Sequence, residues 1–199
     1  MQIIQSPSPN HSSSSYDKTV VILHKTLGYM PWTLQWLQNP SAQVSAQYLI
    51  TKKGEIHQLV ADEDMAWHAG RVYYPSTRAK AVMLKTSWGS YVNPNKYSIG
   101  IENEALANDK WTPEQLKANA WLYKKLRDDP KVAFDGGSES FITHKDVTSY
   151  KPSLDLWRDV ILKEVQKDEE SGCEVVLTDW SQLGLKVGQN GLITIYKKS

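Results

Sequence analysis

Two histidines in this chain stand at the ends of short apolar runs. His24 follows residues 19–23 and His144 follows residues 141–143, and both runs have the β-branched or aromatic character of strands. A carboxylate, Asp155, lies a short way beyond His144. Two imidazoles and a carboxylate are suitable zinc ligands, and three protein ligands leave a fourth position open to water, as in catalytic zinc sites. The spacing therefore predicts a catalytic metal site.

The elements that must position these side chains are mixed in type. Four segments have the pattern of strands: residues 19–24, 48–50, 56–60 and 97–104. Three have helical patterns: a short one from Pro31, one from Thr112 to about Asp128, and one from roughly Leu154 to Lys167. Gly54 supplies the positive φ of a hairpin turn between residues 48–50 and 56–60. This order predicts an α/β fold with a mixed central β-sheet flanked by helices.

Composition narrows the class of protein further. The chain has 199 residues with 40% hydrophobic residues and eight tryptophans, which suffices for a packed core. A net charge of +1 does not indicate the strongly basic surface that is typical of nucleic-acid-binding proteins. The single cysteine, Cys173, excludes an intramolecular disulfide. No secretory signal is visible and no apolar run approaches the ~20 residues of a membrane span, so we expect a protein made in the cytoplasm without a membrane span.

Five blocks of residues resemble one known family in order and in spacing. They are Val21–His24, Val44–Ile50 with Gly54, Ala66–Gly70, Ser98–Glu102, and His144 with Lys151. Through them residues 19–160 resemble the type 2 N-acetylmuramoyl-L-alanine amidases, a superfamily that includes peptidoglycan recognition proteins and phage endolysin amidases. The resemblance implies a zinc cleft on one side of the sheet.

The resemblance also implies roles for individual residues. His24 and His144 fall on the zinc-binding histidines, and Glu102 falls on the general base that takes a proton from water. Lys151 matches a lysine that stabilises the oxyanion of the tetrahedral intermediate. Trp67 and His68 belong to the block that lines the substrate cleft, where His68 either touches substrate or makes structural hydrogen bonds.

A second branch of the family uses a tyrosine in place of the acidic residue. The position of that tyrosine, eight residues before Gly54, is occupied here by Ala46. Tyr48 comes two residues later, so we expect Tyr48 to pack in the core and Glu102 to serve as the base.

The third zinc ligand departs from the family pattern. Ser153 stands where the family has Cys or Asp, and the nearest carboxylate is Asp155, two residues later. Asp155 is the favoured ligand, and Asp146 is a weaker candidate. Asp155 also has a structural interpretation, because an acid in the first turn of a helix is favoured by the helix dipole.

The expected function is zinc-dependent hydrolysis of the amide bond between N-acetylmuramic acid and L-alanine in peptidoglycan. The partner is thus peptidoglycan or a soluble muropeptide, and the biological role is that of an endolysin acting on the cell wall or of a muropeptide-recycling enzyme. The alternative is a non-catalytic peptidoglycan-binding module, since a serine at the third-ligand position also occurs in receptors of the superfamily.

The expected domain organisation has two parts. Residues 1–167 form the catalytic domain, with residues 1–18 as an extended arm on its surface. Residues 168–199 form a charged linker followed by a short β-rich tail, with strands predicted at residues 174–177 and 191–196.

Overall fold

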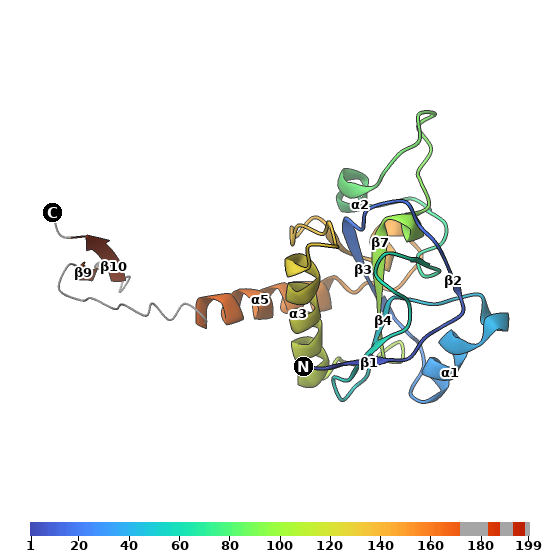
Figure 1. The fold of residues 1–199 in the computed structure, drawn as a ribbon, viewed down its shortest axis with the longest axis horizontal. Coiled ribbons are helices and arrows are strands. Elements are labelled where there is room, and N and C mark those ends of the chain that lie inside the picture. The colour runs from blue at the N-terminus through green and yellow to red at the C-terminus, as the bar shows by residue number, and fades with distance from the viewer. Residues whose placement is uncertain (172–182, 188–192, 198–199) are drawn as a thin grey trace. The chain divides into compact units, whose positions relative to one another are not determined.

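A computed structural model describes residues 1–171, 183–187 and 193–197 of the chain (Figure 1). The chain forms two compact units, Met1–Lys167 and Asp168–Ser199. In the second unit, β9 (Leu183–Val187) pairs antiparallel with β10 (Ile193–Lys197). The strand predicted at residues 191–196 overlaps β10, whereas the one predicted at 174–177 lies outside the described residues.

The first unit is built on a six-stranded sheet with the strand order β1-β5-β4-β7-β3-β8. Its strands are β1 (Ile3–Gln5), β3 (Val20–Lys25), β4 (Tyr48–Ile50), β5 (Ile56–Gln58), β7 (Ser98–Asn103) and β8 (Phe141–Thr143). β4 and β5 form the predicted antiparallel hairpin, with Gly54 at φ 78° in its turn. All other neighbours in this sheet pair parallel. The prediction of a mixed central sheet is therefore confirmed.

Five helices surround this sheet in the described part of the first unit. They are α1 (Trp32–Gln38), α2 (Thr77–Val82), α3 (Pro113–Asp128), α4 (His144–Val147) and α5 (Asp155–Ser171). α3 begins with the predicted capping box, in which Thr112 and Gln115 each bond the other's backbone N–H, and Pro113 occupies its first turn.

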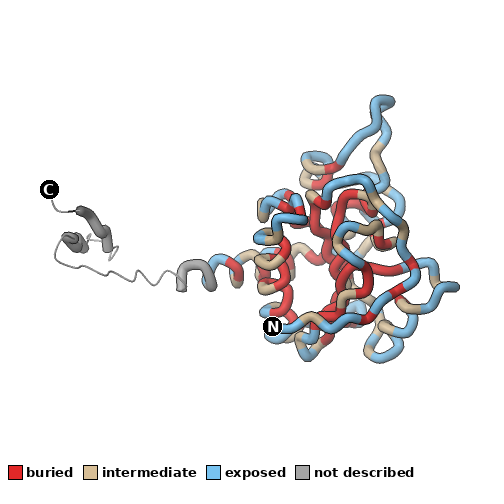
Figure 2. The backbone as a smooth tube through the Cα atoms, viewed as in Figure 1, coloured by how far each residue is buried: buried red, intermediate tan, exposed pale blue. Residues whose placement is uncertain are grey.

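The alternation of side chains along β3 decides which residues face which helices. Val21 and Leu23 belong to a buried cluster with residues of α3 and α5. Val20 and Ile22 point to the opposite face, where they pack with residues of α2. Figure 2 shows buried residues along the central strands and along α3. His24 has the same parity as Val20 and Ile22, so its side chain lies on the face away from α3.

The arm of residues 1–18 is held along the sheet rather than free on the surface. β1 adds to the sheet edge by pairing parallel with β5, and β2 (His11–Ser12) pairs with β6 (Met65–Ala66). The buried Asn10 side chain donates to three backbone carbonyls, those of Leu37, Asn39 and Val44. These bonds tie the arm to the end of α1 and to the segment that follows it.

Among the described helices, none has the length and apolar character needed to cross a membrane.

Candidate active site

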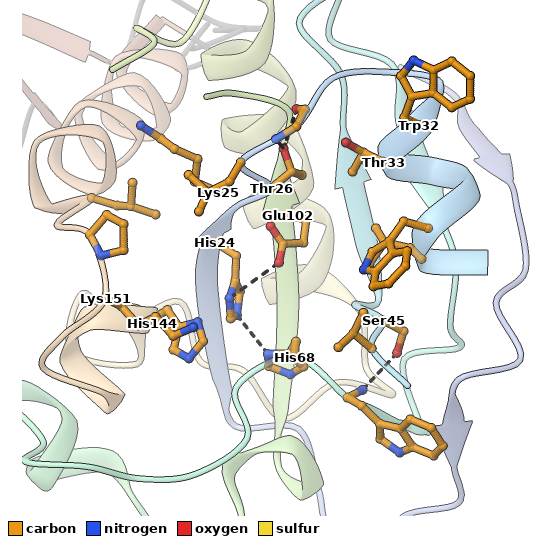
Figure 3. A pocket seen from close by; sticks show the side chains of 18 residues that line it. His24, Lys25, Thr26, Trp32, Thr33, Ser45, His68, Glu102, His144 and Lys151 are labelled. Atoms are coloured by element: carbon orange, nitrogen blue, oxygen red, sulfur yellow. Dashed lines mark hydrogen bonds and ion pairs between the residues drawn. The ribbon is translucent and has the colours of Figure 1, made fainter. Parts of the chain in front are cut away.

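The centre of the site lies where β3 and β7 end side by side. Their parallel register places His24 directly opposite Glu102, and both side chains project into the same cleft (Figure 3). His24 Nδ1 lies 3.8 Å from Glu102 Oε1. The other carboxylate oxygen, Oε2, is shielded from solvent and has no hydrogen-bond partner. A buried carboxylate oxygen without a partner is costly, which points to a group that binds there.

His144 reaches the same place from β8, the strand on the other side of β3. It is the first residue of α4, and its ring centroid lies 4.5 Å from that of His24. Its Nε2 lies 3.2 Å from the carbonyl oxygen of Ala69. The structure thus brings together the two histidines predicted from the sequence.

A third imidazole, that of His68, lies directly beside His24. His24 Nε2 and His68 Nδ1 are 3.0 Å apart. The His68 ring rests against Gly100 of β7, where an added Cβ would stand 2.5 Å from the ring's Cγ. Only glycine at that position leaves room for the ring. The sequence placed His68 in the wall of the cleft and did not reveal this contact with His24.

Burial controls the charge of these groups. It lowers the pKa of His24 well below its usual value, with smaller contributions from His144, His68 and Lys151. Burial likewise lowers the pKa of His68 to about 3 and that of His144 to about 4. It raises the pKa of Glu102 to about 8, against the opposing charge of Lys151. At neutral pH the site therefore holds neutral imidazoles, the form that binds metals, beside a carboxyl group that retains its proton.

These groups line a cleft of about 490 Å³. Lys151, Trp67 and His68, which the sequence assigned to this region, all line it. So do Trp32 and Trp36 of α1, which remain 73% and 57% exposed. The helical pattern from Pro31 predicted the helix but not the exposure of these two tryptophans to the cleft. The signal that could have revealed them is their spacing of four residues, which places both rings on one side of the helix.

Asp155, the favoured third metal ligand, lies elsewhere. It is the first residue of α5, and its half-exposed carboxylate accepts hydrogen bonds from Ser153 Oγ at 2.6 Å and from Arg78 Nη1 at 3.2 Å. The hydrogen bond from Ser153 lowers the pKa of Asp155 most. Partial burial raises this pKa, and the hydrogen bond from Arg78 lowers it further. Neither Asp155 nor Ser153 lines the cleft. The structure does not bring Asp155 to the histidines, and its position agrees with the structural interpretation as an acid in the first turn of a helix.

Asp146, the weaker candidate, is buried and already engaged. Its Oδ2 accepts from the backbone N–H and the hydroxyl of Thr143, both at 2.9 Å, which closes the capping box of α4. Its Oδ1 accepts from Ser76 Oγ at 2.7 Å. Asp146 therefore fixes the start of the helix that carries His144.

The donors in the cleft suit zinc in kind. Neutral imidazoles beside an unpartnered carboxylate oxygen are groups that such a cation binds. Among the residues that the structure describes, however, no group of three or more His, Cys, Asp or Glu side chains is arranged to hold a metal ion. The structure does bring the rings of His24 and His144 together, with their centroids 4.5 Å apart.

Comparison with known proteins defines first a fold and then a family. The fold matches that of AmpD as a selenomethionine derivative, with a TM-score of 0.61, 21% identity, and coverage of 82% of this chain and 93% of that one. It also matches a mutant endolysin from Bacillus subtilis, with a TM-score of 0.57, 19% identity, and coverage of 81% and 99%. AmpDh3 from Pseudomonas aeruginosa, in complex with anhydromuramic pentapeptide, matches with a TM-score of 0.54, 23% identity, and coverage of 75% and 62%. These likenesses define the fold as that of the amidases.

Residues 15–154 match the N-acetylmuramoyl-L-alanine amidase family of type 2, and the chain belongs to this family. N-acetylmuramoyl-L-alanine amidase A of Achromobacter lyticus is 36% identical over 122 residues, or 60% of this chain. The chain spans 56% of the length of that relative.

Proposed function

We propose that this chain is a zinc-dependent amidase that hydrolyses the bond between N-acetylmuramic acid and L-alanine in peptidoglycan. The observation that carries the proposal is the meeting of His24, His144 and Glu102 at the ends of adjacent strands in one cleft. Membership of the amidase family supports it. The muropeptide bound to AmpDh3, a protein of the same fold, supports this class of substrate.

His24 and His144 are the residues that would hold the metal. When bound, zinc supplies an activated water and polarises the scissile carbonyl. The neutral state of both imidazoles at neutral pH suits this role, because a protonated ring cannot ligate. Asp155 would have to leave Arg78 and Ser153 to become the third ligand.

Glu102 is placed to move the proton. Burial raises the pKa of Glu102 to about 8, so the ionised form of Glu102 is a stronger base than an exposed glutamate. A group whose pKa lies near the operating pH can take a proton from water and return it to the departing amine. Lys151 lines the same cleft and would stabilise the negative oxygen that forms on the substrate.

The aromatic wall suits the rest of the substrate. Trp32, Trp36 and Trp67 all line the cleft, and Trp32 and Trp36 are largely exposed. Tryptophan rings combine an apolar face with one polar N–H, which fits the faces of sugar rings and peptide stems. We assign these residues to binding rather than to the chemical step.

The second candidate function is a peptidoglycan-binding module that does not cut. It is favoured by Ser153 at the family's third-ligand position and by the lack of a three-ligand group among the described residues. Against it stands Glu102, because binding alone does not require a carboxylate buried without a partner.

Digestion of purified peptidoglycan separates the two functions. We expect mass spectrometry to show free peptide stems with new L-alanine amino termini, and we expect a chelator to abolish this release until zinc is restored. Sedimentation of the protein with the same walls measures binding independently. Binding without release of stems would establish the non-catalytic module. Comparing rates on intact walls with rates on soluble muropeptides would then distinguish an endolysin from a recycling enzyme.

The role of Asp155 can be tested by removing its carboxylate. Because that carboxylate already bonds Arg78 and Ser153, we expect Asp155→Ala to keep the zinc content of the wild type. We expect a loss of stability of about 0.3–1 kcal/mol, the usual size of an exposed acid's contribution at a helix start. Asp159→Ala is the control, since Asp159 is an exposed acid of the same helix paired with Arg158. Loss of zinc from Asp155→Ala alone would restore Asp155 as a ligand.

A further inference from the structure

One loop contacts the Nε2 atoms of both His24 and His144, the two histidines that would bind the metal. His24 Nε2 meets His68 Nδ1 at 3.0 Å, and His144 Nε2 meets the carbonyl oxygen of the next residue, Ala69, at 3.2 Å. The side-chain oxygen of buried Asn95 fixes this loop by accepting from three successive backbone N–H groups, those of His68, Ala69 and Gly70, at 3.3, 2.7 and 3.3 Å. Adjacent residues of one anchored segment therefore contact both imidazoles.

The contact with Ala69 defines the tautomer of His144. A carbonyl oxygen can only accept a hydrogen bond, so His144 must carry its proton on Nε2. In a neutral ring the other nitrogen, Nδ1, then keeps its lone pair. His144 is thus held with Nδ1 ready to ligate.

The tautomer of His24 is defined through a longer chain of hydrogen bonds. Ser98 Oγ donates its single proton to the carbonyl oxygen of Pro94 at 2.7 Å. Toward His68 Nε2, at 3.3 Å, the Ser98 oxygen can therefore only accept, so His68 carries its proton on Nε2. His68 Nδ1 is then an acceptor, and the proton between the two rings belongs to His24 Nε2.

The opposite arrangement leaves a mismatch at the end of the chain. A proton on His24 Nδ1 would require His68 to donate from its own Nδ1, so that its Nε2 became an acceptor. Two acceptors would then face each other between His68 and Ser98, whose proton is already given to Pro94. Only one direction satisfies every group, and it leaves the lone pair of His24 on Nδ1, the nitrogen next to Glu102.

We propose that the loop Trp67–Gly70 is a tautomer-setting device, in which His68 and Ser98 are positioning residues that orient the lone pairs of His24 and His144 toward the metal. This inference rests on the proposed zinc-dependent function. Outer partners of ligating histidines fix the tautomer and ring orientation, and their loss typically lowers metal affinity by about 10–100-fold. Gly100 belongs to the same device, because any side chain at position 100 would clash with the His68 ring.

The direct test is nitrogen NMR of the histidine rings in the metal-free full-length protein, which reports the protonated nitrogen of each ring. In the wild type we expect His24, His68 and His144 all to carry the proton on Nε2. In Ser98→Ala, which removes the hydroxyl acceptor but keeps the bond of the Ser98 backbone to the His68 ring, we expect the tautomers of His24 to shift partly toward protonation on Nδ1. Ser140→Ala is the matched control: Ser140 is a buried serine bonded to Asp135 and the carbonyl of Gly137, and it does not touch His68.

Zinc titration with a competing chelator gives the second measurement. We expect His68→Ala to bind zinc about 10–100-fold more weakly but still to reach one ion per chain at saturation. Failure of that variant to bind at any zinc concentration, with its fold intact, would make His68 a ligand and overturn the proposal. A wild-type His24 protonated on Nδ1 would overturn it as well, whether or not the variants fold. A wild type with the expected tautomers but without zinc binding or amide hydrolysis would instead refute the proposed function and leave the assignment of the device intact.

Discussion

Replacing either His24 or His144 by alanine is expected to remove zinc from the purified protein. In the proposed site His24 and His144 are the metal ligands, so the loss of one would leave a single protein ligand. Loss of a hydrogen-bond partner of a ligating histidine lowers metal affinity by about 10–100-fold. We expect loss of the ligand itself to lower the zinc affinity by more than that. Metal analysis of the purified variants and chelator competition measure this loss, and amide hydrolysis should disappear with the metal.

His57→Ala is the control for these two variants. His57 is a buried histidine of β5 that bonds Ser6 Oγ and lies outside the cleft lining. His57→Ala also removes a buried imidazole from the fold. We expect the zinc content of this variant to match that of the wild type. Full zinc occupancy in both His24→Ala and His144→Ala would show that the metal, if bound, lies elsewhere.

The part of the site that could be predicted is the part that strand geometry determines. His24 ends an apolar run whose alternate residues face opposite sides of the sheet, and Glu102 ends another run of the same kind. Parallel strands end at the same edge, so two such residues meet once the strands are neighbours. Local pattern was sufficient to place His24 at a strand end and to predict the capping box that starts α3, whereas the role of Glu102 was expected only from the family resemblance.

The position of His68 depended on contacts that no local pattern reports. Its loop is fixed by Asn95, more than twenty residues further along the chain, and its ring fits only because Gly100 lacks a side chain. Likewise, Asp155 pairs with Arg78 of α2, a helix that the sequence patterns did not predict. A spacing along the chain could suggest that Asp155 lay near the metal, but not which way α5 would turn it.

Glu104 shows the limit of the alternation argument. In a strand over residues 97–104, alternation would put Glu104 on the same face as Glu102, but β7 ends at Asn103. Glu104 is buried and accepts from the backbone N–H groups of Met30 and Lys52, at 2.8 and 2.7 Å. It therefore joins the turn before α1 to the hairpin turn, and its role is structural.

Glu102→Gln is expected to bind zinc and muropeptide nearly as the wild type does, with turnover lowered by about 10²–10⁴-fold. General acid–base groups contribute about this much, and they act in the transition state rather than in binding. Glu104→Gln, just beyond the end of the same strand, is the control, and we expect it to show reduced stability and little change in turnover per folded molecule. Unimpaired turnover in Glu102→Gln would show that another group is the base.

The same substitution is expected to stabilise the metal-free protein at alkaline pH. Burial raises the pKa of Glu102 from 4.5 to about 8, so in this range the folded state keeps a proton that the unfolded state releases. Stability from this proton is fully present below about pH 4.5 and is lost as the pH rises through about 8. Glutamine does not titrate, so Glu102→Gln lacks this loss. At ~1.4 kcal/mol per pKa unit, the variant should exceed the wild type by up to about 5 kcal/mol above pH 8, relative to their difference at pH 4.

Urea denaturation of both metal-free proteins between pH 4 and pH 9 measures this difference. We expect the two stability curves to diverge steadily above about pH 5, with the wild type falling faster. Parallel curves would show that the Glu102 carboxyl is not held protonated by the fold, and the unpartnered oxygen would then need another explanation. A group that lowers stability where it is charged, yet is needed for turnover, is what a buried general base should be. Loss of turnover together with gain of alkaline stability in one variant would therefore identify Glu102 as that base, which a purely structural carboxylate could not imitate.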